Sequence, residues 1–160
     1  MKEYERRFGT FTLKLVLVLV PLVGGLISAR IAGDMMKGFG SMNRPPMAPA
    51  AWLFPVAWTV LYVMMGVALL LMVQSKSQYK VGAIALFTSQ LLMNFIWSPV
   101  FFNMQEYWMA LAIIVAMWLT EVITAIVAWF VDKRATLLLL PLILWTSFAT
   151  YLNAGVAVLN

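Results

Sequence analysis

The sequence predicts an all-α membrane protein in which five spanning helices form one bundle. Of its 160 residues 64% are hydrophobic and only 11% are charged, whereas soluble domains are about half apolar and a quarter charged. The apolar residues gather into five stretches, each long enough for the roughly 20 residues that a membrane-spanning helix requires. Because lipid offers the backbone no hydrogen-bond partners, these long unbroken runs predict helices and not the short alternating strands of a barrel.

The five expected spans cover approximately residues 11–32, 52–73, 81–102, 108–131 and 136–159. Three of the joints between them are short and polar, at 74–80, 103–107 and 132–135. Short joints force consecutive helices to lie antiparallel, so we expect a single domain over 1–160.

The first span follows a basic amino-terminal segment, as the core of a secretory signal peptide also does. Its apolar run is longer than the roughly 7–15 residues of such a core, so we expect it to be a membrane helix. Pro21 is expected to kink this helix, and Gly24 and Gly25 allow a neighbouring helix to approach closely.

The connection at 33–51 is unusually long and is rich in Gly, Met and Pro. Pro45, Pro46 and Pro49 disfavour helix in themselves and in the residues before them, so we expect a non-helical loop. Long loops of this kind more often cover binding sites than act as spacers, which makes 33–51 a candidate lid over a pocket.

The basic residues are divided unequally between the two ends of the spans. Most of the 11 lie on the side of the amino terminus, namely Lys2, Arg6, Arg7, Lys14, Lys76, Lys80, Lys133 and Arg134; the other side has Arg30, Lys37 and Arg44. The positive-inside rule then predicts a cytoplasmic amino terminus and an external long loop. With no long basic run, the net charge of +5 indicates contact with the lipid bilayer and not with nucleic acid.

Three spans carry aromatic and polar side chains at helical spacing along one face. These are Trp58, Tyr62 and Met65 in the second span, Phe87, Gln90, Asn94, Trp97 and Phe101 in the third, and Trp145, Phe148, Ala149 and Leu152 in the fifth. Because amides that face lipid are costly, Gln90 and Asn94 are expected to face the bundle interior. The three faces predict an apolar pocket for a small hydrophobic ligand. The alternative is that the amides join helices and that the tryptophans anchor the membrane interface, which suits Trp52, Trp108 and Trp129.

Glu121 is the one carboxylate deep inside a predicted span. An ionisable group in the membrane is costly and is therefore a functional hypothesis, such as proton relay or pairing with a cationic substrate. Alternatively, Glu121 is simply protonated or bonded to a neighbouring helix.

The chain contains no Cys and no His. This excludes disulfides and thiolate sites and removes the commonest neutral metal ligand, so we expect no metal site and no obligatory cofactor. No nucleophile–base pair or phosphate-binding glycine loop is present, and acid–base catalysis would have to use Glu121 or Tyr62. We therefore expect a binding protein more than an enzyme. Tight ligation of a haem iron is not expected either. Binding of a metal-free porphyrin by aromatic stacking is not excluded.

Three long motifs follow one another along the chain: RPPMAPAAWLFPVAWTVLY at 44–62, QLLMNFIWSPVFF at 90–102 and LPLILWTSFATYLN at 140–153. Together with the run from Pro21 to Gly24, they resemble the translocator protein family (TspO, the peripheral benzodiazepine receptor and tryptophan-rich sensory protein family). The resemblance covers the chain from about Pro21 to Asn153.

This resemblance implies a five-helix bundle, often a homodimer, that binds porphyrins such as protoporphyrin IX, sterols or benzodiazepine-type drugs beneath the first loop. Bacterial members are linked to tetrapyrrole and stress signalling, which implies a bacterial cell membrane. Light-dependent porphyrin breakdown is also attributed to them, and the matching tryptophans here would be Trp58 and Trp145. Carried over by position, the ligand-binding residues would be Trp58, Tyr62, Gln90, Asn94, Trp97, Trp108, Trp145, Phe148, Ala149 and Leu152.

The chain departs from the family pattern in two places. Met47 and Ala50 stand in the first loop where the family often has Trp and a second Pro, so the lid is expected to differ. Ala154 and Val158 occupy the positions of the Tyr and Arg of the animal sterol-recognition segment, so cholesterol is not expected as the native ligand.

The leading interpretation is a membrane protein that takes a porphyrin or similar flat ligand into an aromatic pocket, for tetrapyrrole transport or regulation. The alternatives are a proton-coupled small transporter that uses Glu121 and a light-dependent porphyrin-degrading enzyme.

Overall fold

The computed structural model describes the backbone of residues 2–160 and the side chains of 12–34 and 38–160. Its elements are α1 (Lys2–Ala32), α2 (Met35–Ser41), α3 (Leu53–Gln74), α4 (Lys80–Ser98), the π-helical turn η1 (Pro99–Asn103), α5 (Tyr107–Trp129) and α6 (Lys133–Leu159). The all-α fold is confirmed, since the described residues contain no strand.

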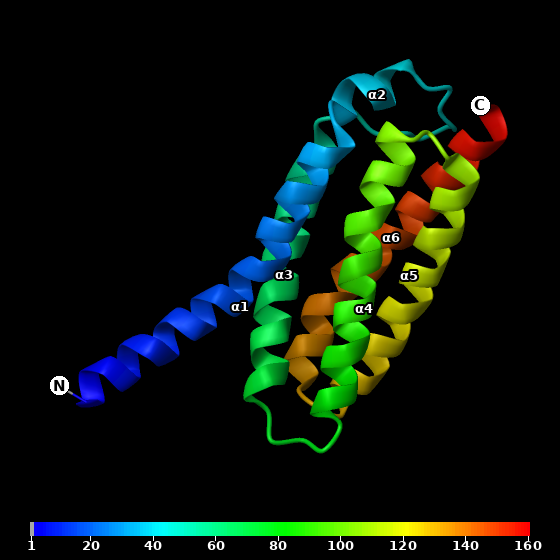
Figure 1. Cartoon of the computed structure of the whole chain (residues 1–160). Helices are drawn as coiled ribbons and strands as arrows, with labels where there is room; N and C mark the ends of the chain where they lie inside the picture. Colours follow the sequence, from blue (N-terminus) through cyan, green and yellow to red (C-terminus); the bar gives the residue numbers. More distant parts are fainter. Residues whose placement is uncertain (1) are drawn as a thin grey trace.

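Five helices of the described chain are long and apolar enough to cross a membrane. They cover Thr12–Ala32, Leu53–Gln74, Lys80–Asn103, Tyr107–Trp129 and Lys133–Leu159, within a few residues of the predicted spans. α5 packs against α4 and α6, while α3 packs against α1 and α6. Figure 1 shows these helices running alongside one another, with α2 across one end and the amino-terminal part of α1 leaving the bundle.

The prediction of a wholly non-helical first connection is wrong over Met35–Ser41, which forms α2. Gly33, with a φ of 81°, ends α1 in the left-handed conformation that glycine adopts readily. The amide of Gly38 then donates to the carbonyl of Asp34 at 2.9 Å in the first turn of α2. The three prolines begin only at Pro45, so they restrict the second half of the connection and leave the first half free to form a helix.

The second half of this connection is fastened to the carboxyl end of α6. The Tyr151 hydroxyl donates to the carbonyl of Pro46 at 2.8 Å. The amide of Asn43 donates to Asn160 Oδ1 at 3.0 Å, and Asn160 Nδ2 donates back to the carbonyl of Asn43 at 2.9 Å. Pro45 packs so closely on Gly155 that a Cβ there would come within 2.5 Å of the proline ring. The connection therefore covers one end of the bundle.

The joints between α3 and α4 and between α5 and α6 meet at the opposite end. The Ser75 hydroxyl donates to the carbonyl of Val131 and the Ser77 hydroxyl to that of Phe130, both at 2.9 Å. Lys76, Lys133 and Arg134 are exposed in these joints, whereas Arg30 and Arg44 are exposed at the other end of the bundle. The side chains of Lys2, Arg6, Arg7 and Lys37, which also enter the count of basic residues, lie outside the described residues.

Candidate ligand-binding site

Aromatic side chains of α3 and α6 meet inside the bundle. Trp58 stacks on Tyr62, one turn later in α3, with ring centroids 5.5 Å apart and an interplanar angle of 28°. Trp145 forms T-shaped contacts with Trp58 and with Phe54, and the ring centroids are 6.5 Å and 5.8 Å apart, respectively. Trp58 and Trp145 pack against both buried apolar clusters of the protein, so this aromatic group lies where the two halves of the core join.

Two amide side chains of α4 face the interior, and one of them contacts this aromatic group. Gln90 and Asn94 are almost fully buried, at 1% and 2% exposure. The Tyr62 hydroxyl donates to Asn94 Oδ1. Within the described part of the chain, the remaining Asn94 nitrogen, both amide atoms of Gln90 and the indole N–H of Trp145 are buried without a hydrogen-bond partner. A buried polar atom left in this way costs about 1–3 kcal/mol, so these groups offer donors and an acceptor to a bound molecule.

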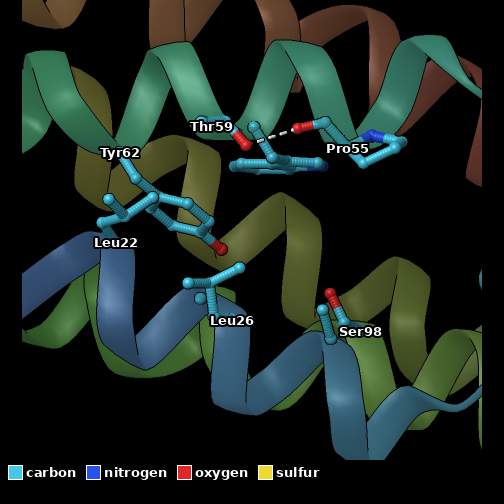
Figure 2. Close-up of a pocket in the computed structure, with 9 residues that line it drawn as sticks. Leu22, Leu26, Pro55, Thr59, Tyr62 and Ser98 are labelled. Carbon is cyan, nitrogen blue, oxygen red and sulfur yellow. Dashed lines mark hydrogen bonds between the residues drawn. The ribbon is translucent and has the colours of Figure 1, made fainter.

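A cavity of about 70 Å³ opens between α1 and α3 beside the aromatic group (Figure 2). Trp58 and Tyr62 form one wall, and Leu22 and Leu26 of α1 form the other. Its remaining lining residues are Gly25, Ala29, Pro55, Thr59 and Ser98. Gly25 is required here, because a Cβ at this position would lie 2.1 Å from the Tyr62 ring. The cavity is smaller than the roughly 300–1,000 Å³ of drug-sized ligand pockets.

The other residues that the sequence predicts for the site lie in three different surroundings. Ala149 and Leu152 are buried in the same apolar cluster against which Trp145 and Phe148 pack, and Phe148 lies 6.2 Å from Trp145. Trp108, at 65% exposure near the start of α5, is not brought to the site.

Trp97 belongs to a structural network near one end of the site. Its indole N–H donates to Asn153 Oδ1 at 3.0 Å, and Asn153 Nδ2 donates to the carbonyl of Tyr107 at 2.9 Å. Its ring stacks on Phe101 at 5.1 Å. These bonds join α4, α5 and α6, so Trp97 and Asn153 are already paired within the protein.

Phe54 is the member of the aromatic group that the sequence reasoning missed. It is 6% exposed and also packs on Phe39 of α2, at 4.8 Å. Phe54 precedes Trp58 by four residues and Tyr62 by eight, and this helical spacing would have placed it on the same face.

Glu121 lies between α5 and α6 at 2% exposure and does not line the cavity beside Trp58. The Thr146 hydroxyl donates to Glu121 Oε2 at 2.5 Å and also lies 2.8 Å from the carbonyl of Leu142. Glu121 is therefore bonded to a neighbouring helix. Across the described residues, no group of three or more His, Cys, Asp or Glu side chains could hold a metal ion.

Comparison with known proteins identifies the family of this chain. Residues 17–159 match the TspO/MBR family. The tryptophan-rich protein TspO of Chlorobaculum tepidum is 36% identical, over 92% of this chain and 98% of its own. The tryptophan-rich sensory protein of Cereibacter sphaeroides is 35% identical over 76% of each chain. The translocator protein of Sus scrofa is 31% identical over 84% of this chain and 82% of its own.

The family match begins before Pro21 and ends after Asn153, so it includes nearly all of the membrane-spanning part of the chain and every residue of the aromatic site. The chain is therefore a multi-pass membrane protein that belongs to the TspO/MBR family.

Proposed function

We propose that this protein binds a flat, apolar ligand of the porphyrin type inside the bundle, between the aromatic rings of α3 and α6 and the amides of α4. The observation that carries the proposal is the group of buried polar atoms on Gln90, Asn94 and Trp145 that have no partner in the described chain. They lie in an interior that is otherwise apolar and aromatic. A porphyrin matches both features, because its ring stacks on indole and phenol rings while its nitrogens and carboxylates form hydrogen bonds.

Binding of so large a ring requires the interior to open. The cavity of about 70 Å³ beside Trp58 holds only part of a porphyrin, so the ligand must separate Trp58 and Tyr62 from the residues of α1 that face them. The gap between α1 and α3 is the route of entry on this proposal, which lets a hydrophobic ligand arrive from the lipid. The name of one bacterial relative, the tryptophan-rich sensory protein of Cereibacter sphaeroides, favours a sensory role for such binding.

The test is the quenching of tryptophan fluorescence by protoporphyrin IX, titrated in the dark on the detergent-solubilised protein. Native protein is expected to show saturable quenching. Trp145→Phe keeps an aromatic ring but removes the unpaired indole N–H, so the dissociation constant should rise about three- to tenfold, the effect of one hydrogen bond.

Trp118→Phe is the matched control. Trp118 is also half-buried, but its indole N–H already donates to Ser147 at 2.8 Å. Its replacement removes the same number of fluorophores and should leave the dissociation constant unchanged. Quenching that does not saturate, or that weakens equally in both variants, would mean that porphyrin partitions into the micelle. The proton-coupled transporter would then be the better-supported hypothesis. Its test is to compare proton movement into vesicles that contain native protein or the Glu121→Gln variant.

A further inference from the structure

A second hollow feature follows the seam between α5 and α6, apart from the aromatic site. An open depression of about 430 Å³ has Ala125 and Trp129 of α5 on one side and Thr136 and Leu140 of α6 on the other. A second depression, of about 330 Å³, is lined by Val115, Trp118, Ser147 and Thr150 of the same two helices. Neither depression includes a residue of the aromatic site.

The lining residues place the two depressions one after the other along the seam between α5 and α6. Most of their lining residues recur every three or four positions, at Val115, Trp118, Val122, Ala125 and Trp129 along α5 and at Thr136, Leu140, Ile143, Ser147 and Thr150 along α6, and Ile126 and Phe130 flank the α5 set. This spacing keeps each set on a single helix face. From 115 to 129 the groove extends for about 21 Å at 1.5 Å per residue, compared with a hydrocarbon core of about 30 Å. We call this feature the α5–α6 groove.

The positively charged side chain of Lys133 lies at one end of the α5–α6 groove. Lys133 Nζ lies 5.0 Å from the centroid of the Trp129 ring, which lines the groove. The neighbouring Arg134 is occupied, since it donates to both carboxylate oxygens of Asp132, at 3.1 and 2.8 Å. Arg134 also lowers the pKa of Asp132, so that carboxylate stays charged. Within the described chain Lys133 forms no ion pair, which leaves its charge available to a ligand.

We propose that the α5–α6 groove binds an anionic phospholipid, with one acyl chain along the groove and the phosphate paired with Lys133. The groove is almost wholly apolar, and its polar Trp118 and Ser147 side chains satisfy each other. One acyl chain spans half of the hydrocarbon core, about 15 Å, so it fits within the groove. Trp129 suits the interfacial level at which a phosphate lies, and a basic residue at that level attracts anionic lipid.

A second copy of the chain fits the groove less well. A two-fold dimer would bring the same face of each subunit together. Two hollow surfaces that face each other leave a void, and such voids lose the packing that stabilises an interface. A flexible acyl chain fills the groove without that loss.

Native mass spectrometry tests the proposal on protein in micelles that contain equal amounts of palmitoyl-oleoyl phosphatidylglycerol and phosphatidylcholine. One retained phosphatidylglycerol is expected, favoured about fivefold over phosphatidylcholine, as one lysine near the surface provides. Lys133→Gln should abolish that preference. Ile126→Trp, which fills the groove from a lining residue at 57% exposure, should lower the retention of both lipids.

Each variant has a matched control. Lys76→Gln makes the same charge change in the α3–α4 joint at the same end of the bundle, and Ile123→Trp makes the same size change at a 48% exposed α5 residue that does not line the groove. Both should behave as native protein. Equal retention of the two lipids by native protein, or an equal loss of preference in Lys76→Gln, would overturn the site at Lys133. Unchanged retention in Ile126→Trp would place the lipid elsewhere, and a shift from dimer to monomer in that variant would assign the groove to a second copy.

Discussion

Buried polar groups of this bundle fall into two kinds, and the difference separates structural residues from candidate ligand contacts. Glu121 accepts a hydrogen bond from Thr146, and Trp97 donates one to Asn153. Gln90 is as deeply buried as these, but neither of its amide atoms has a partner in the described chain. A paired group stabilises the fold, whereas an unpaired one lowers its stability unless a bound molecule completes the hydrogen bonds.

Gln90→Met should therefore have opposite effects on stability and on binding. Met has nearly the shape of Gln without the amide, so the ligand-free protein should gain about 1–3 kcal/mol, the cost of an unpaired buried group. Binding of protoporphyrin IX should weaken in the same variant. Thermal unfolding in detergent measures the first effect and fluorescence quenching the second. Gln74→Met, at an exposed position at the end of α3, is the control. A lower melting temperature for Gln90→Met would show that the amide stabilises the fold.

Glycines of α1 and α3 lie at points where neighbouring helices approach closely. A Cβ at Gly66 of α3 would lie 2.1 Å from the carbonyl oxygen of Val18 in α1. A Cβ at Gly24 of α1 would lie 2.2 Å from the Phe95 ring of α4. One turn after Gly24, the Ser28 hydroxyl of α1 donates to the carbonyl of Phe95 at 2.6 Å. These contacts set the position of α1, and with it the width of the gap beside Trp58.

Gly66→Ala should destabilise the protein by about 1–3 kcal/mol, because the new methyl group meets backbone that cannot rotate away. Gly82→Ala in α4 is the matched control, since nothing lies within 4 Å of a Cβ there. Alanine favours helix over glycine by about 1 kcal/mol, so the control should be neutral or slightly more stable. Thermal unfolding of both variants in the same detergent measures the difference. Equal melting temperatures of the two variants would mean that α1 does not pack on α3 at Gly66.

The two ends of the whole molecule differ in charge and in construction. One end has the short α3–α4 and α5–α6 joints with Lys76, Lys133 and Arg134. The other has Arg30 and Arg44, together with α2 and the proline-containing segment, which is fastened to α6 through Tyr151 and Asn160. Because positively charged loops remain in the cytoplasm, this division predicts that α2 lies outside.

Cysteine labelling in intact cells tests this orientation, and the native chain provides a background without cysteine. Met47→Cys, at a position with 82% exposure in the segment after α2, should react with a membrane-impermeant maleimide. Lys76→Cys, exposed in the α3–α4 joint, should react only after the membrane is permeabilised. The reverse pattern of labelling would invert the predicted topology.

Hydropathy alone was enough to establish the fold class and to place the five spans within a few residues, because the length of an apolar run is a local property that the bilayer selects directly. The cost of amides in lipid also placed Gln90 and Asn94 in the interior. Helix pairing could not be read in this way. Only the tertiary structure showed that Phe54 contacts Trp145 and that Trp108 is exposed. It also showed that Trp97 and Glu121 have hydrogen-bond partners, whereas the Gln90 amide has none in the described chain. A hydrogen bond or ring contact depends on which helices meet and at what height, and that depends on contacts such as Gly66 against Val18, between residues far apart in the chain.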